Sequence, residues 1–159
     1  MLSLTQRLAP DHNAEVAHTL QLTAEERSRS RHRFSATDGT EVQLVLARGT
    51  NLRDGDLLRA ADSDALVRVQ ARPEPVLTVR TTDADALTRA AYHLGNRHVA
   101  LELGRGYLRL SPDSVLAEML TQLGLEVVKE IAPFQPEAGA YAGHAHHQDM
   151  SRVPFRRHS

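Results

Sequence analysis

The chain has 159 residues, a formal net charge of −1 at pH 7, 41% hydrophobic residues and only 4% aromatic residues. This length allows one domain or two small ones, and the near-neutral charge excludes a global field that would draw the chain to nucleic acid or an anionic membrane. Because no cysteine is present, a metal would have to be held by imidazole, carboxylate, carbonyl or water.

The N-terminal segment MLSLTQRLAPDHN lacks the apolar core of about 7–15 residues that a signal peptide requires. No run approaches the roughly 18 apolar residues that are needed to cross a bilayer. We therefore expect a soluble, cytoplasmic protein.

The first 72 residues predict an all-β domain, because short alternating segments are separated by turn residues. The pair Asp38-Gly39 is a strong hairpin signal, since a type I′ turn needs positive φ at its central positions. AEERSR at 24–29 can form a helical turn but has too few apolar positions for a stable helix. The expected strands lie at 16–23, 31–36, 41–47, 52–58 and 65–71.

The stretch ARPEPV at 71–76 contains two prolines in three residues, which favours an extended linker over a helix or a central strand. We place the domain boundary there. The predicted organisation is a β-rich domain at 1–72, a second domain at 75–135 and a flexible His-containing tail at 136–159.

The second domain predicts the order β-α-β-β-α-β, which is the ferredoxin-like arrangement and makes the whole chain α+β. We expect its first helix to open with a capping box of Thr82 and Asp85 and to end at Gly95. Its second helix should open with Ser111 as N-cap and end at Gly124. The expected strands lie at 76–80, 98–103, 107–110 and 125–131.

From Pro133 onwards the chain has no sustained periodicity and is rich in Ala, Gly, Pro, His and Arg. This composition predicts a mobile tail.

His98 lies in the stretch AYHLGNRHVALEL, between the expected helix and the expected strand. Its simplest interpretation is a partly buried strand histidine that is hydrogen-bonded to a neighbour. His93 is no chelating partner, because five helical positions turn the side chain by roughly 140°. One strand histidine does not hold a metal, so a metal site at His98 needs a second chain or the tail.

The tail contains three clustered histidines, His144, His146 and His147. The alternative interpretations are a solvated neutral tail or a tag, but a tag is usually an unbroken run. Neutral imidazole suits Ni, Cu(II) and Zn, and three rings on a flexible segment can adapt to the geometry of the ion. Such a site suits metal delivery better than catalysis, which needs a rigid set of ligands.

Three long stretches stand out, namely DALTRAAYHLGNRHVALEL at 85–103, LAEMLTQLGLEV at 116–127 and PFQPEAGAYAGHAHH at 133–147. They contain two specific motifs, GNRH at 95–98 and PEAGAY at 136–141. Together with the β-rich first half, these stretches resemble the urease accessory protein E family of nickel metallochaperones, and the similarity covers nearly the whole chain.

The resemblance implies a peptide-binding-like first domain and a ferredoxin-like second domain that binds metal and dimerises. In the implied non-enzymatic homodimer, His98 meets its two-fold mate to bind Ni²⁺, with Zn²⁺ or Cu²⁺ as competitors. It also implies the urease accessory GTPase and the urease apoprotein complex as partners. Some family members carry a pair of histidines where this chain has Ser111-Pro112-Asp113-Ser114, so we expect no accessory metal site there.

Three rival functions remain open on the sequence. A zinc- or copper-binding or storage protein would use the same histidines. An RNA-binding βαββαβ module would stack bases on aromatic residues of the central strands, where the chain offers only Tyr107. A metal-dependent hydrolase would need a general base beside His98, and Glu102 on the expected strand is the candidate.

Overall fold

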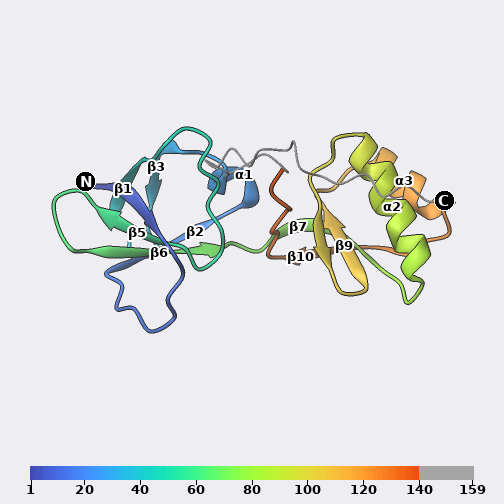
Figure 1. Ribbon diagram of the computed structural model, residues 1–159, viewed down its shortest axis with the longest axis horizontal. Helices are drawn as coiled ribbons and strands as arrows, with labels where there is room; N and C mark the ends of the chain where they lie inside the picture. Colours follow the sequence, from blue (N-terminus) through green and yellow to red (C-terminus); the bar gives the residue numbers. More distant parts are fainter. Residues whose placement is uncertain (140–159) are drawn as a thin grey trace, which may run out of the picture.

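The computed structural model describes residues 1–139 and contains two units, each built on its own β-sheet (Figure 1). The fold is therefore α+β, as the sequence predicts. The first unit contains β1 (Leu2–Leu8), β2 (His18–Leu22), α1 (Ala24–Arg27), β3 (Arg31–Ser35), β4 (Glu41–Val45), β5 (Leu57–Ala60) and β6 (Leu66–Ala71). The second unit contains β7 (Glu74–Arg80), α2 (Ala84–Asn96), β8 (Glu102–Gly104), β9 (Tyr107–Leu110), α3 (Ser114–Gln122) and β10 (Val127–Ala132).

The first sheet contains an interior strand, β1, that the sequence analysis did not predict. The strand order is β2-β6-β5-β1-β4-β3, and β1 pairs parallel with β4 and antiparallel with β5. The pairing with β5 shifts register between Leu4 and Gln6, and this irregularity breaks the alternation of buried and exposed side chains along the strand. Leu4 is nevertheless fully buried in the core of this unit.

The predicted hairpin is confirmed, because β3 and β4 pair antiparallel. Its turn is not type I′, however, since Gly39 has a φ of 86° but Asp38 does not have a positive φ. The strand expected at 52–58 is wrong over most of its length. The N–H of Asp56 donates to the carbonyl of Arg53 across a turn in which Gly55 has a φ of 88°, so β5 begins only at Leu57.

The stretch expected as a linker is mostly strand. β6 ends at Ala71 and β7 begins at Glu74, and Pro75 pairs with Ile131 of β10. On its other side β7 meets β9 only from Leu77 onwards. Pro75 therefore has a single neighbouring strand, which is the situation in which a sheet tolerates proline.

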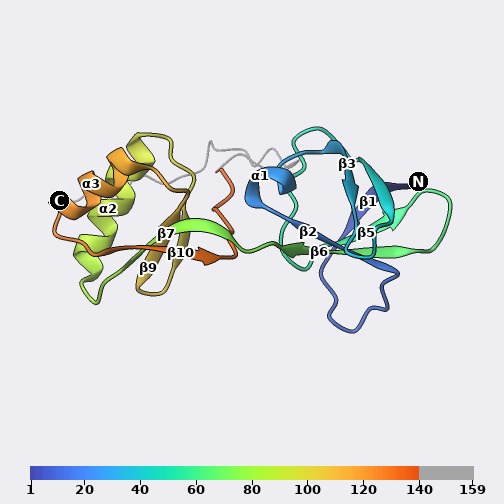
Figure 2. The ribbon, with the colours of Figure 1, turned by 180° about the vertical axis from the view of Figure 1, so that it is seen from behind.

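The second sheet has the order β10-β7-β9-β8, and all its neighbouring strands are antiparallel. Both long helices pack on the same face, and the other face is turned towards the first unit (Figures 1 and 2). The core between helices and sheet contains Leu77, Val79, Ala90, Leu94, Leu101, Leu108, Leu110, Leu120 and Leu125.

Aspartates begin both helices, which corrects the predicted caps. Asp83 is the N-cap of α2 and accepts from the N–H groups of Asp85 and Ala86. Asp113 is the N-cap of α3 and accepts from the N–H of Leu116. A carboxylate stabilises a helix N-terminus both as a hydrogen-bond acceptor and as an anion, so it outcompetes the nearby Thr82 and Ser111.

The segment Pro133–Glu137, here called the strap, does not behave as the mobile tail expected from Pro133 onwards. Its backbone is hydrogen-bonded to both units, and Phe134 is only 2% exposed. In Figure 1 the strap runs between the two sheets. His144, His146 and His147 lie outside the described residues.

None of the helices in residues 1–139 is long and apolar enough to span a membrane.

Candidate functional site

His98 occupies the turn that ends α2. The N–H of His98 donates to the carbonyl of Gly95 (3.0 Å), and the N–H of Val99 donates to the carbonyl of Leu94 (3.2 Å). This pair of hydrogen bonds is the Schellman motif, which requires a left-handed residue directly after the helix. His98 supplies that conformation with a φ of 56°, and its side chain is exposed.

The left-handed backbone of His98 sets it apart within the described chain. It is the only non-glycine residue of residues 1–139 with a positive φ. A side chain with a Cβ costs roughly 1–2 kcal/mol in this conformation, although histidine is among the residues that tolerate it best. Residues held at such a cost are concentrated at functional sites.

The structure corrects two expectations about this region. His98 lies on a turn, because α2 runs through Gly95 to Asn96 and β8 begins only at Glu102. Glu102 is 9% exposed, and its two carboxylate oxygens accept from Tyr107, Arg109 and the backbone of the strap. It is therefore engaged in structural contacts and is not free to act as a general base beside His98.

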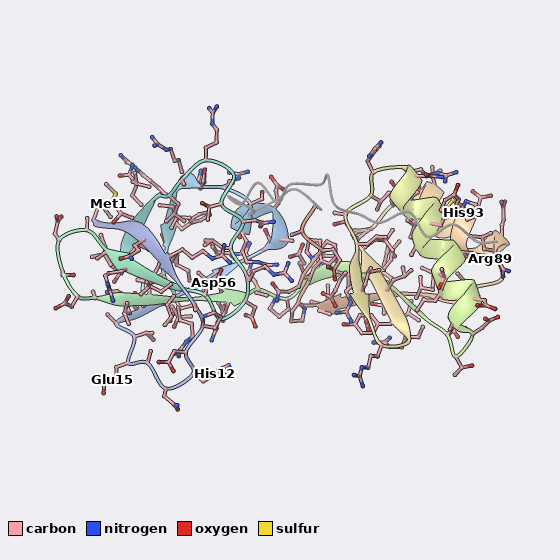
Figure 3. The ribbon with its side chains drawn as sticks, viewed as in Figure 1. Met1, His12, Glu15, Asp56, Arg89 and His93 are labelled. Atoms are coloured by element: carbon pink, nitrogen blue, oxygen red, sulfur yellow. The ribbon has the colours of Figure 1, made fainter. Side chains whose placement is uncertain are left out.

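His93 lies in the last turn of α2, and Figure 3 shows it with Arg89 along the outer side of this helix. Its ring packs edge-on against Tyr92, with centroids 5.4 Å apart. Its backbone carbonyl accepts from the Arg97 guanidinium at 3.0 Å. Within residues 1–139, no three His, Asp or Glu side chains gather into a group that could hold a metal ion.

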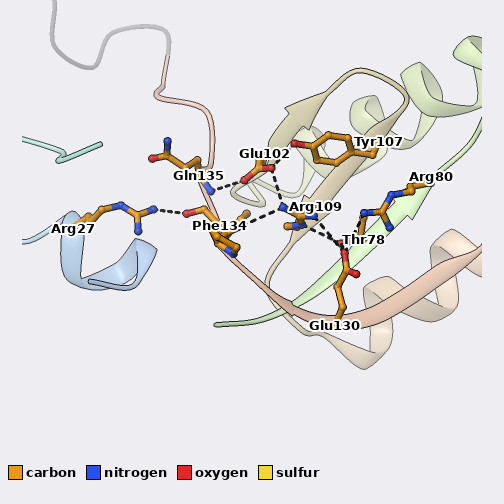
Figure 4. A network of polar contacts seen from close by, with 10 residues as sticks. Arg27, Thr78, Arg80, Glu102, Tyr107, Arg109, Glu130, Phe134 and Gln135 are labelled. Atoms are coloured by element: carbon orange, nitrogen blue, oxygen red, sulfur yellow. Dashed lines mark hydrogen bonds and ion pairs between the residues drawn. The ribbon is translucent and has the colours of Figure 1, made fainter. Parts of the chain in front are cut away.

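A network of charged side chains covers the helix-free face of the second sheet (Figure 4). Glu102 accepts from the Tyr107 hydroxyl at 2.7 Å and from Arg109 at 3.2 Å. Arg109 also donates to the Thr78 hydroxyl at 3.0 Å and to Glu130 at 3.3 Å. The pairing of β8 with β9 and of β9 with β7 aligns Glu102, Arg109 and Thr78 in one row, so they share a face.

The absence of a side chain at Gly104 leaves space for the Tyr107 ring of this network. A Cβ at Gly104 would overlap the ring of Tyr107, which is directly opposite on β9. The ring lies over the glycine, and its hydroxyl thereby reaches Glu102. The hydrogen bond to the Glu102 carboxylate raises the pKa of Tyr107 above its ordinary value.

Glu130 lies at the other end of the network from Glu102. The Thr78 hydroxyl donates to Glu130 at 2.6 Å, and Arg80 lies 3.4 Å from the same carboxylate. The hydrogen bond from Thr78, supported by Arg80 and Arg109, lowers the pKa of Glu130.

Arg27 links the first unit to the strap. Its side chain is 1% exposed and donates to the carbonyls of Leu22 (2.8 Å) and Phe134. Burial lowers the pKa of this guanidinium, and the carboxylates of Glu74 and Asp54 oppose the shift.

Sequence analysis missed the network of charged side chains on the helix-free face of the second sheet, because its members lie on separate elements. Only the alternation in LEL and YLRL indicated a polar face there.

The fold is that of a two-unit α+β protein that presents an exposed imidazole at the end of a helix. Residues 4–72 match the family model described as UreE urease accessory protein, N-terminal domain, and residues 74–159 match the one for its C-terminal domain. Relatives named urease accessory protein UreE are similar over nearly the whole chain.

The relative from Nostoc punctiforme is 56% identical over 146 residues, which cover 92% of this chain and 99% of the relative. The one from Microcystis aeruginosa is 50% identical over 159 residues, covering 96% and 98%. The one from Burkholderia thailandensis is 54% identical over 157 residues, covering 95% of this chain and 73% of the relative. The chain belongs to the UreE family of urease accessory proteins, which confirms the resemblance found in its sequence and implies a role in urease maturation.

Proposed function

We propose that this protein is a non-enzymatic, homodimeric metallochaperone that binds Ni²⁺ and delivers it for assembly of the urease active site. The observation that carries the proposal is the exposed imidazole of His98 at a left-handed helix end. Glycine would fit this turn at lower cost, and the presence of histidine in its place supports a use for the imidazole beyond ending the helix.

His98 is a single ligand in each chain, and a two-fold axis beside it would supply a second. His144, His146 and His147 are the further ligands in this proposal. Zn²⁺ and Cu²⁺ can compete, because neutral imidazole suits all three ions.

The exposed apolar residues support a dimer formed through the second unit. Among residues 1–139, every large hydrophobic residue that is exposed, apart from Met1, lies in that unit. Covering some of these residues with a partner would remove apolar area from water and so favour association. These residues are Tyr92, Leu103, Val115, Leu123, Val128 and Ile131.

We further propose that the second unit is a ferredoxin-like domain at 75–135 that follows a β-rich domain at 1–72 and precedes a tail at 136–159. The antiparallel order β10-β7-β9-β8, with both helices on one face, supports this assignment. In the proposed role the protein works in the cytoplasm, where its partners are the urease accessory GTPase and the urease apoprotein complex.

Nickel titration calorimetry, read beside a molecular-mass measurement, tests the proposal. Wild type should be a dimer that binds Ni²⁺ tightly, and His98→Ala should lose the tight phase. His93→Ala is the matched control and should bind within about threefold of wild type, since that ring lies on another face. Normal nickel binding by His98→Ala would contradict the proposal, and tighter binding of Zn²⁺ or Cu²⁺ than Ni²⁺ would favour the alternative metal role.

A further inference from the structure

The strap is hydrogen-bonded to the second unit along its whole length (Figure 4). It leaves β10 at one edge of the second sheet and reaches β8 at the other edge, so it crosses the helix-free face. Three hydrogen bonds hold it there. They are Arg109 to the Pro133 carbonyl (3.1 Å), the Gln135 N–H to Glu102 (2.6 Å) and the Glu137 N–H to the Leu101 carbonyl (2.6 Å).

The first unit also holds the strap. Two of its arginine side chains and one of its backbone N–H groups donate to this segment. The bonds are Arg27 to the Phe134 carbonyl, Arg53 to the Pro136 carbonyl (2.6 Å) and the Asp54 N–H to the side-chain oxygen of Gln135 (3.1 Å). Gln135 therefore bonds to the second unit through its backbone and to the first unit through its side chain.

Two buried apolar side chains lie outside the cores of both units. Phe134 and Val76 are at most 2% exposed, yet neither belongs to either core. Leu77 and Val79 of β7 pack into the core beneath the helices, so Val76 points to the helix-free face, which is turned towards the first unit. The junction between the units therefore has a small apolar centre of its own, to which the strap contributes Phe134.

Few other contacts fix the orientation of the two units. The chain passes from one to the other only through Arg72-Pro73. Within the described part of the chain, a single hydrogen bond runs directly from residues 1–71 to residues 74–132, from the Ala24 N–H to Glu74 (2.9 Å). Glu74 adjoins the linker, so this bond acts close to the pivot and restrains rotation weakly. Units that lack a large apolar interface move relative to one another as a rule.

We propose that the strap is a clasp that holds the two units in one fixed orientation. It does so because the same five residues are bonded to both units and place a buried ring between them. Releasing the clasp lets the units rotate about Arg72-Pro73. A fixed orientation presents side chains of both units as one preorganised surface, which lowers the cost of binding a partner that contacts both. No metal ion takes part in this device, so it is independent of the proposed nickel role.

The test measures the distance between the units in the full-length chain. The chain has no cysteine, so spin labels on Arg33→Cys and Arg89→Cys occupy one defined, exposed position in each unit. With the natural strap, the labels should give a single narrow distance distribution. Combining Arg53→Met with Phe134→Ala removes one bond and the buried ring of the clasp, and this strap variant should widen the distribution by about twofold or more.

Arg59→Met combined with Val79→Ala is the matched control. It also removes an arginine of the first unit and a buried apolar side chain of the second. Arg59, however, donates to Gln6 of its own unit, and Val79 belongs to the core beneath the helices. The control should keep the narrow distribution. An unchanged distribution in the strap variant, or equal widening in both variants, would overturn the proposal.

Hydrogen exchange keeps the proposal testable if the strap variant does not fold. In the wild-type protein the N–H groups of Gln135 and Glu137 donate to the second unit, so both should exchange about 100-fold or more slowly than in an unstructured chain. Unprotected amides at these positions, or a broad distance distribution with the natural strap, would show that the segment does not hold the units and would overturn the proposal.

Discussion

The two long helices of the second unit end in the same motif but use different residues to do so. At the end of α3 the N–H of Gly124 donates to Thr121 and that of Leu125 to Leu120, which repeats the pattern found after α2. Gly124 has a φ of 83°, and His98 has a φ of 56°. Glycine is the expected residue at this position, so α3 follows the rule for ending a helix and α2 departs from it. A departure that costs stability and leaves an imidazole exposed supports the proposed metal role of His98.

The largest expected effect comes from making the two helix ends alike. His98→Gly keeps the turn and removes the ring, so nickel affinity should fall by at least about 100-fold, the upper range seen when only an outer-shell partner of a metal ligand is lost. Calorimetric titration measures this loss. Tight nickel binding by His98→Gly would show that the difference between the ends has nothing to do with metal.

The converse change tests the conformational side of the comparison. Gly124→Ala should lower the free energy of unfolding by about 1–2 kcal/mol, because alanine resists the left-handed conformation. A Cβ there meets no atom within 4 Å, so the loss comes from the backbone alone. His98→Ala is the control, since both residues carry a Cβ in the left-handed turn, and it should lower stability by less than Gly124→Ala does, by about 0.5–1 kcal/mol. Urea unfolding of both variants measures these changes in the free energy of unfolding.

The N-terminus of α3 provides a further test, which compares the residue that caps the helix with the residue that the sequence indicated. Asp113→Ala should cost about 1 kcal/mol of unfolding free energy, because it removes the acceptor for the Leu116 N–H. Ser111→Ala, at the position that the sequence alone indicated as the cap, should cost less than about 0.5 kcal/mol. Neither variant should alter nickel binding. A nickel defect in Ser111→Ala would point to an accessory metal site at the start of α3.

A smaller effect of opposite sign is expected at the α2 end. His98→Gly should raise the free energy of unfolding by about 0.5–1 kcal/mol, less than the alanine penalty at Gly124 because histidine tolerates this region and glycine gains chain entropy on unfolding. Thermal and urea unfolding of the metal-free protein measure it. A loss of stability would mean that the His98 ring stabilises the turn.

The turn at Gly39 offers the smallest and most local test of how left-handed positions are stabilised. The backbone N–H of Thr40, followed by the His18 ring at 2.6 Å, lowers the pKa of the adjacent Asp38 to about 2 from 3.8. The folded-state pKa is depressed, so the stabilisation is complete above pH 3.8 and is lost as the pH falls towards 2. Asp38→Asn should therefore show a shallower fall in stability across this range, measured by urea unfolding at several pH values. An unchanged slope would mean that Asp38 does not contribute.

Much of the fold was readable from local patterns. The hairpin at Gly39, the strands β2, β4, β6 and β9 and the two long helices follow from alternation, turn residues and helical periodicity. β1 was missed because its register shift breaks the pattern. The ends of α2 were misassigned because capping depends on which of several nearby polar groups reaches the free N–H groups, and spacing alone does not decide this.

The sequence by itself determined the family, the two-unit organisation and the choice of His98 as the central candidate, because these depend on residue identity and local order. Only the tertiary structure decided that His98 lies on a left-handed turn, that Glu102 is buried in a charged network and that Pro133–Glu137 is anchored across the sheet. These facts depend on contacts between residues far apart in the chain. Gln135 meets Glu102, and Phe134 meets Arg27, because the two sheets fold against a common strap, and no periodicity within either segment records that meeting.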